Sequence, residues 1–279
     1  MGELRFGPPP KTTFAVTPTP AEVRFFRDNG YLVVERLTTD EELAWIRRIV
    51  EYIFDPQHAR EPGAPIDRSG TLEPGEESRL SQAFFPEMQF PELLHTAHRR
   101  NARRYAAALL GVDESRLSSW GHMIAKPPGG RAALWHQDHA YWLPEIDYCA
   151  LGVWLPMHDV PVEMGAMQFI PGSHKRGLLP HRHADAPVHN VLTVGEPIDE
   201  SQAVACPLKA GGATFHHSET LHYTAPNTTG EIRLAYPMEF QIAPVRRKVP
   251  EHMPWVDERR AATGVPPLTY VADGRVIEL

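Results

Sequence analysis

The spacing of apolar residues changes near residue 117, and this change restricts the folds open to the chain. From there to about residue 245, helical spacing disappears and short apolar runs alternate with Pro/Gly turns. Short strands at regular intervals with such turns are typical of a β-sandwich or jelly roll. The runs lie at 122–126, 150–155, 167–170, 203–207, 213–215 and 234–240. We therefore expect a mainly β core.

The N-terminal third has the spacing of helices instead. A capping box with proline at the first helical position occupies 19–22, and Asn29-Gly30 is a C-terminal signal, so a short helix is expected between them. A strand at 31–34 and a second helix from about 38 to 53 should follow. A third helix is predicted over 91–111. These helices should flank the β core.

No change of composition marks a linker between two domains. We predict one domain over residues 1–279, with an N-terminal arm, helices and a loop in 1–115, a jelly-roll core in 116–245 and a C-terminal tail in 246–279. Residues 56–80 are rich in Pro, Gly, Glu and Ser. They should form a long loop, which is either a solvated linker or a functional segment.

Composition excludes several classes of protein. The net charge of −7 leaves no basic footprint for nucleic acid or an anionic membrane. No apolar stretch approaches the roughly 20 residues that cross a bilayer, and the first residues lack the apolar region of a secretory signal. The two cysteines, Cys149 and Cys206, do not form a disulfide framework. We expect a cytoplasmic protein with a small-molecule substrate; the sequence does not indicate its oligomeric state.

A possible metal site begins with the segment WHQD at 135–138. His136 and Asp138 are two residues apart, so on a strand they would point to the same face and could bind one metal. A further His would complete a set of two His and one carboxylate, which suits Fe(II) oxygen chemistry. The same spacing occurs at 183/185 and 217/219, and about two such pairs are expected by chance among 15 His and 35 acidic residues.

A second segment, LHYTAPN at 221–227, helps to choose among these pairs. Arg233 follows His222 by eleven residues. We predict that a strand, a tight turn at Asn227–Gly230 and a return strand bring the two side chains near each other. Arg is the natural partner of a carboxylate, so it could hold the far end of a dicarboxylate cosubstrate that chelates the metal.

Chain length between ligands favours the first pair. Asp138 precedes His222 by 84 residues, which leaves room for several strands, whereas the pair at 183/185 leaves only 37. The pair at 217/219 would need His252 as its distant partner, and Thr263 stands where that arrangement would require an Arg.

Taken together, these segments resemble the phytanoyl-CoA dioxygenase family. The resemblance rests on WHQD, GVW at 152–154, GAMQFIPGSHKRG at 165–177, and LHYTAPN with Arg233. FRDNGYLVVERLTTDEEL also resembles the family's N-terminal helix–strand–helix, so most of 20–245 is covered. The family consists of Fe(II)/2-oxoglutarate oxygenases with a double-stranded β-helix core. The resemblance therefore implies a single oxygenase domain of that fold.

The resemblance also implies roles for individual residues. It assigns His136, Asp138 and His222 as iron ligands and Arg233 as the partner of the distal carboxylate of 2-oxoglutarate. Thr224 would add a hydroxyl to that carboxylate, at a position where the family more often has Ser.

Other positions carry two interpretations each. Trp154 stands where the family places an aromatic beside the cosubstrate, or it packs in the core. His122 is at a position that often faces the cosubstrate, but His is unusual there, and it is otherwise a core His. For His216 and His217, strand packing or surface exposure is the favoured interpretation. The pair 141–142 lines the substrate pocket or belongs to the core.

The reaction implied by the resemblance uses Fe(II), 2-oxoglutarate and O2, and releases succinate and CO2. Related halogenases leave one ligand position to chloride, but Asp138 occupies it here. Hydroxylation, epoxidation, desaturation or cyclisation is therefore expected. Loops at 56–85, 139–148 and 177–200 should select a mid-sized, partly apolar molecule such as a secondary metabolite. The stretch 139–147 does not follow the ectoine hydroxylase signature, so that substrate is discounted.

Two alternatives remain open. A cupin-like metalloenzyme, such as an isomerase or a direct dioxygenase, would share the core and the ligands but would not need Arg233 at its offset from His222. A non-catalytic binding relative would be expected to lose at least one ligand, whereas all three candidates are present.

Overall fold

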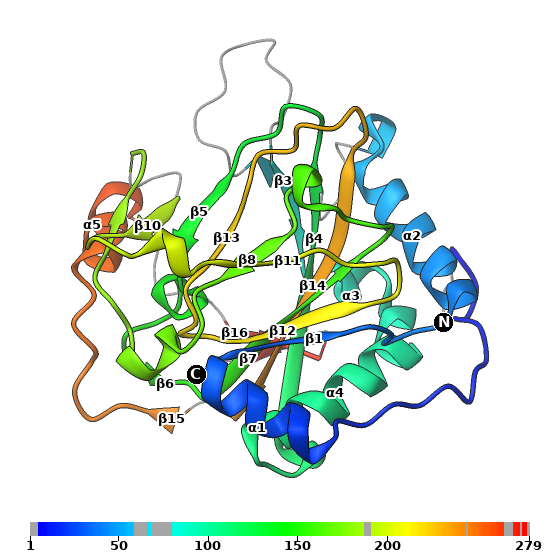
Figure 1. Ribbon diagram of the computed structural model, residues 1–279, viewed down its shortest axis with the longest axis horizontal. Helices are drawn as coiled ribbons and strands as arrows, with labels where there is room; N and C mark the ends of the chain where they lie inside the picture. Colours follow the sequence, from blue (N-terminus) through cyan, green and yellow to red (C-terminus); the bar gives the residue numbers. More distant parts are fainter. Residues whose placement is uncertain are drawn as a thin grey trace.

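The computed structural model describes residues 5–58, 66–67, 80–186, 191–243, 245–264, 270–273 and 275–277. Most of the loop predicted over 56–80, and part of the one predicted over 177–200, lie outside the described residues. Two antiparallel sheets face each other within the described part of the chain, with helices on the outer side of the larger sheet (Figure 1). The prediction of a mainly β, double-stranded β-helix core with flanking helices is confirmed.

The first helix and strand follow their local signals. Helix α1 spans Pro20–Asn29, and the capping box is complete: the Thr19 hydroxyl accepts from the amide of Glu22 at 3.2 Å, and the Glu22 carboxylate accepts from the amide of Thr19 at 2.6 Å. Gly30 ends the helix with φ of 80°. A Cβ there would lie 2.3 Å from His174 Nδ1, so glycine also permits a close approach. Strand β1 then spans Tyr31–Val34.

The later helices match the prediction only in part. Helix α2 spans Asp40–Phe54, and a short helix α3 spans Pro86–Gln89. The helix predicted over 91–111 is divided into a 3-10 segment at Pro91–His95 and helix α4 at Ala97–Leu110. The division has a physical cause, because Thr96 is extended and caps α4, and the buried Glu42 carboxylate accepts from the first amides of that helix.

The seven-stranded sheet, called the major sheet here, is ordered β1-β12-β7-β14-β4-β3-β2. Its further strands are β12 (Ala213–His217), β7 (Ala150–Pro156), β14 (Arg233–Ile242), β4 (Leu117–Lys126), β3 (Ser81–Phe84) and β2 (Ile66–Asp67). The minor sheet is ordered β11-β8-β13-β5. Its strands are β11 (Val204–Cys206), β8 (Met167–Phe169), β13 (His222–Thr224) and β5 (Ala133–His136).

Alternation along the strands gives the major sheet two different faces. On β14, Tyr236 and Phe240 point to the outer face and join one core cluster with residues of α2 and α4. Ala235 points to the inner face, where Trp154 of β7 and Phe169 of β8 belong to a separate cluster between the two sheets. Side chains on the inner face of the major sheet can therefore contact side chains of the minor sheet.

Smaller elements complete the described fold. Three two-stranded sheets are formed by short strands: β9 (His181–His183) pairs with β10 (Leu192–Val194), β6 (Ile146–Asp147) with β15 (Val245–Arg246), and β16 (Tyr270–Ala272) with β17 (Arg275–Ile277). Helix α5 spans Pro254–Thr263.

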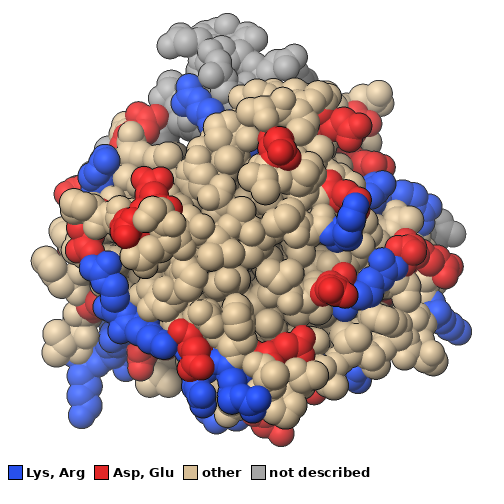
Figure 2. Space-filling view, in the orientation of Figure 1, with Lys and Arg blue, Asp and Glu red and all other residues tan. Residues whose placement is uncertain are grey.

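Helix hydropathy and surface charge can be described for the same residues. Among the described residues, no helix has both the length and the hydropathy of a membrane span. On the face shown in Figure 2, basic and acidic side chains are intermixed around a centre of other residues.

Candidate active site

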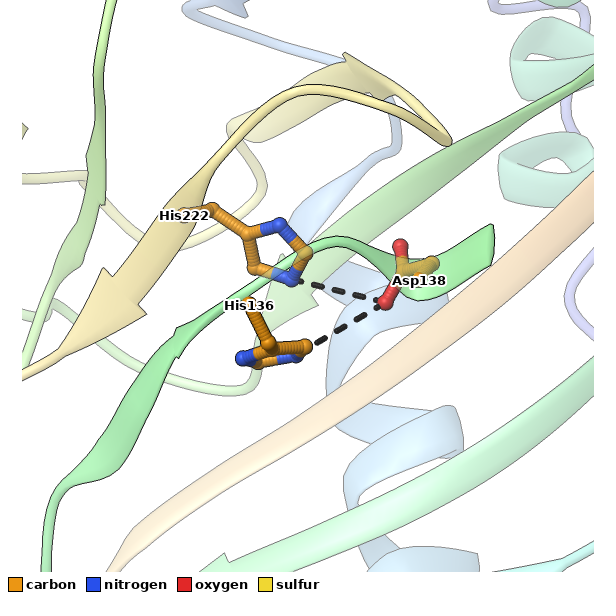
Figure 3. Close-up of side chains that lie close together, drawn as sticks. All are labelled: His136, Asp138 and His222. Carbon is orange, nitrogen blue, oxygen red and sulfur yellow. Dashed lines mark ion pairs between the residues drawn. The ribbon is translucent and has the colours of Figure 1, made fainter. Parts of the chain in front are cut away.

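Three of the predicted side chains meet between the two sheets. His136 is the last residue of β5 and lies opposite His222, the first residue of β13. The carboxylate oxygen Oδ1 of Asp138 is 3.4 Å from Nε2 of His222 and 3.8 Å from Nε2 of His136. Figure 3 shows both imidazole rings directed at this carboxylate. The structure thus brings together the three residues that the sequence suggested as ligands.

One local expectation about this group is wrong. Asp138 does not share a strand with His136, because β5 ends at His136 and Asp138 begins a 3-10 turn, Asp138–Tyr141. The turn, rather than strand alternation, directs the carboxylate toward the two imidazoles.

Backbone carbonyls fix the orientation of both imidazoles. Nδ1 of His136 is 2.5 Å from the carbonyl oxygen of Leu134, and Nδ1 of His222 is 2.9 Å from that of Thr220. A carbonyl only accepts, so each Nδ1 donates and each Nε2 is left to face the centre, where its lone pair can bind a metal. One ligand atom from each of the three residues lies within 4.8 Å of the others. This donor set fits a metal bound by two His and one carboxylate, with further positions open to ligands.

The protonation states also fit a metal site. Burial lowers the pKa of His136 to about 3, so its imidazole is neutral. Burial would raise the pKa of Asp138, but the charge of His222 and hydrogen bonds from His216 and His222 hold it well below its ordinary value. Burial lowers the pKa of His222, yet the carboxylate of Asp138 outweighs it and the net shift is upward. A bound metal would replace the proton on His222.

His216 contacts the group from the major sheet, contrary to the favoured packing or surface interpretation. Its Nε2 donates to Oδ2 of Asp138 at 2.8 Å, and its side chain is 6% exposed. Gly152 on the adjacent strand makes room for the ring, since a Cβ there would lie 2.5 Å from that Nε2. His217 is half-buried and only packs beside the turn, where its Nδ1 accepts from the amide of Glu219. The contact of His216 depends on strand register, for which the sequence carries no local signal.

Two buried cations lie on the inner face of the major sheet. Arg233 and Lys126 are directly opposite each other in the register of β14 and β4. Arg233 is 2% exposed and Lys126 is fully buried. Within the described part of the chain, no carboxylate lies within 4.0 Å of either cation. Burial lowers the pKa of Arg233 to about 10, and burial with the charge of Arg233 lowers that of Lys126 to about 6.

Neutral groups hold both cations in place. Nη1 of Arg233 donates to the carbonyl of Gly165 at 2.6 Å, and its guanidinium carbon lies 5.2 Å from the ring centre of Trp154. Nζ of Lys126 donates to the hydroxyl of Thr224 and to the carbonyl of Ala225, both at 2.7 Å. Trp154 and Thr224 therefore lie beside the cations, as the sequence suggested.

The predicted hairpin between His222 and Arg233 is wrong. Strand β13 pairs with β5 and β8 in the minor sheet, whereas β14 pairs with β4 and β7 in the major sheet. The turn at 227–230 thus crosses from one sheet to the other. Asn227 stabilises this crossing by donating to the backbone carbonyls of Lys126 and Glu231.

His122 belongs to a half-buried aromatic wall. Its ring stacks on Phe84 with centroids 5.6 Å apart and contacts Trp120, also at 5.6 Å. Phe85 contacts Trp120 at 5.4 Å. Tyr141 is nearer the candidate ligands, edge-on to the ring of His136 at 5.5 Å. Nothing in these contacts assigns His122 to a cosubstrate.

Comparison with known proteins identifies the family. A model of the phytanoyl-CoA dioxygenase (PhyH) family matches residues 26–235, well over half of the chain. The chain belongs to the phytanoyl-CoA dioxygenase family. This confirms the resemblance and makes the protein a non-haem iron oxygenase that uses 2-oxoglutarate and O2.

Individual members of the phytanoyl-CoA dioxygenase family and of the wider fold are similar over most of the chain. Phytanoyl-CoA dioxygenase domain-containing protein 1 of Danio rerio is 26% identical over 258 residues, covering 78% of this chain and 88% of that protein. EvdO2 of Micromonospora carbonacea var. aurantiaca, solved in complex with 2-oxoglutarate, is 32% identical with a TM-score of 0.75, covering 87% of this chain and 98% of that one. The nogalamycin epimerase SnoN is 23% identical with a TM-score of 0.66, covering 89% and 92%, which shows the shared fold.

Proposed function

We propose that the protein oxidises a C–H bond of a mid-sized, partly apolar small molecule, with His136, Asp138 and His222 binding Fe(II). The observation that carries this proposal is the pairing of a three-ligand metal group with buried cations that lack a carboxylate partner in the described structure. Iron and 2-oxoglutarate, when bound, supply the activation of O2, with release of succinate and CO2.

The protein's own groups hold and orient the reactants in this proposal. Arg233 binds the distal carboxylate of 2-oxoglutarate, because a buried guanidinium without an anion is costly and a carboxylate matches its fork of donors. Trp154 packs against the guanidinium and keeps water away from it. His216 fixes Oδ2 of Asp138, so that Oδ1 alone faces the two imidazoles. The presence of Asp138 favours hydroxylation, or a related oxidation, over halogenation.

The substrate pocket is proposed to open over β4. Along this strand, residues on the helix-covered face are buried, while the inner-facing residues from Ser118 to Ile124 are only half-buried. The aromatic wall of Phe84, Phe85, Trp120 and His122 lies on this side. Apolar and aromatic walls with few polar groups are typical of sites for small organic molecules. This supports a partly apolar substrate such as a secondary metabolite.

The cosubstrate-free alternative is less well supported. A cupin-like isomerase or direct dioxygenase would have no anion to place beside Arg233 and Lys126, and their burial would then be an uncompensated cost. A non-catalytic relative is also disfavoured, because all three ligand side chains are present and face one another.

Anaerobic titration of the apoprotein with Fe(II) and then 2-oxoglutarate tests the proposal. We expect a weak visible charge-transfer band that requires both additions. Zn(II) is the matched control, because it suits the same His and carboxylate donors but has a filled d shell and gives no such band. Iron binding without a band would favour the cosubstrate-free metalloenzyme. Failure to bind iron would show that the three residues have only a structural role.

A further inference from the structure

Lys126 contacts the proposed cosubstrate site through a hydrogen bond with a defined direction. The ammonium form of lysine, which a bound anion would favour, only donates, so in that form the hydroxyl oxygen of Thr224, 2.7 Å from Nζ, is the acceptor. The hydroxyl proton of Thr224 is then free to be donated elsewhere. Among the described residues, no protein group accepts it, although Thr224 is 5% exposed. The described protein groups therefore leave this donor unused.

No described carboxylate balances the positive charges beside this hydroxyl. Lys126 and Arg233 are opposite each other in the register, and Nε of Arg233 is buried without a hydrogen-bond partner among the described residues. Nζ of Lys126 already contacts the Thr224 hydroxyl and the Ala225 carbonyl. An anion between these groups would stabilise both cations and would accept from the hydroxyl and the guanidinium together.

Gly165 permits close packing beside both cations. Gly165 has φ of +83°, and a Cβ there would lie 2.5 Å from the carbonyl oxygen of Ala225 and 3.4 Å from Nζ of Lys126. The carbonyl of Gly165 in turn accepts from Arg233. Gly165 thus binds Arg233 directly and leaves room for Lys126 beside the end of β13.

We propose that Lys126 is a positioning residue for 2-oxoglutarate, which orients the Thr224 hydroxyl to donate to the distal carboxylate and adds a positive charge behind Arg233. This inference rests on the proposed function. It gives the site a preference for keto acids with a second carboxylate, since only these place an anion where the hydroxyl and the two cations converge.

A purely structural role for Lys126 predicts a different result. If Lys126 served only to hold the end of β13 through Ala225, its loss would displace His222, three residues earlier, and weaken every keto acid alike. The two roles are separated by 2-oxopentanoate, which has the keto acid and the chain length of 2-oxoglutarate but lacks the distal carboxylate.

The test compares the dissociation constants of both acids for the Fe(II) protein, measured by the charge-transfer band under anaerobic conditions. For Lys126→Met we expect 2-oxoglutarate to bind at least about tenfold more weakly and 2-oxopentanoate to change by less than about twofold. Thr224→Val should give the same pattern, Thr224→Ser should restore parent affinity, and the double variant should be no weaker than about the worse single variant. Equal weakening of both acids, or unchanged 2-oxoglutarate binding, would overturn the inference.

A substitute variant and a comparison with the parent protein keep the result interpretable. If Lys126→Met does not fold, Lys126→Gln makes the same comparison with a neutral side chain of similar length, and the Thr224 variants test the hydroxyl directly. If the parent protein gives no band with either acid, the proposed function itself fails. A band in the parent with no selective loss in the variants rejects only the role of Lys126.

Discussion

The two faces of the major sheet differ in whether their buried charges have ionic partners. On the helix-covered face, Arg99 donates to the carboxylate of Glu87 at 2.8 Å, and both side chains are less than 5% exposed. Tyr236 donates to the same carboxylate oxygen at 2.7 Å. On the inner face, Arg233 and Lys126 are equally buried but have only neutral partners in the described structure. Each charge on the helix-covered face depends on its partner, whereas the unpaired cations of the inner face are the ones proposed to meet a ligand.

The contrast occurs within one strand. Tyr236 and Arg233 are both on β14, and their side chains point to opposite faces. Glu239 is on the inner face too, between Gly152 and Trp120, and its Oε2 is buried without a partner in the described part of the chain. The inner face therefore holds a buried acid oxygen without a partner as well as cations without a carboxylate, near the proposed metal ligands.

The largest expected effect is at the ligands themselves. His136→Ala or Asp138→Ala should abolish iron binding and lower activity by at least about a thousandfold, ~4 kcal/mol, because no neighbouring group can replace a missing donor. Circular dichroism should show an intact fold. Substrate-stimulated succinate release and iron content measure the effect.

His183→Ala provides a matched control for the ligand variants. His183 has an acid two residues later, as His136 does, but its Nε2 is 2.8 Å from the carbonyl oxygen of Trp255 and takes no part in the metal group. This variant should retain iron. Turnover of 2-oxoglutarate at the parent rate in either ligand variant would refute the assigned ligands.

Breaking the ion pair on the helix-covered face should lower the stability of the fold. Arg99→Met leaves Glu87 buried and unpaired, which should lower the free energy of unfolding by about 3–5 kcal/mol. Denaturant unfolding of the apoprotein measures this loss. The affinity of the folded variant for 2-oxoglutarate should stay within about twofold of the parent value, because Arg99 is on the opposite face. A loss below about 1 kcal/mol would mean that the pair contributes no more than an exposed ion pair.

Removing a cation from the inner face should weaken cosubstrate binding instead of lowering stability. Arg233→Met should weaken 2-oxoglutarate by about 100-fold, ~2.7 kcal/mol, with iron still bound. The free energy of unfolding without cosubstrate should not fall, because the substitution removes a buried cation that has no anion. Anaerobic titration and denaturant unfolding give the two values. Unchanged cosubstrate affinity would transfer the role to another cation.

Local signals explain what the sequence predicted well. The capping box at Thr19, the stop at Gly30 and the strand at Tyr31–Val34 involve residues that are neighbours in the chain, and the structure reproduces them. The three proposed ligands were also suggested by the sequence, because their types and spacing resemble those of a family, and the structure brings them together. Short-range patterns are sufficient for such features.

The remaining features depend on which distant strands pair. The contact of His216 with Asp138 needs β12 beside β7, and the position of Lys126 opposite Arg233 needs β4 beside β14. Periodicity shows that a residue is on a strand face but does not identify the strand across from it. For the same reason the predicted hairpin between β13 and β14 was wrong, since the chain crosses between sheets at that point.

The smallest expected effect comes from one substitution made on both faces. Burial, and then the charge of Asp138, raise the pKa of Glu239 well above its ordinary 4.5. The free energy of unfolding therefore falls as the pH rises from 4.5 toward the pKa of the folded state, because the folded protein loses this proton less readily than the unfolded chain. Glu239→Gln removes this penalty and should stabilise the iron-free protein by about 1 kcal/mol at pH 8, with a smaller gain at pH 5. Glu87→Gln, which breaks the pair with Arg99, should destabilise it instead. Urea unfolding at both pH values measures the two signs, and a loss of stability in Glu239→Gln would show that this carboxylate has a partner and that the inner face is not an unpaired one.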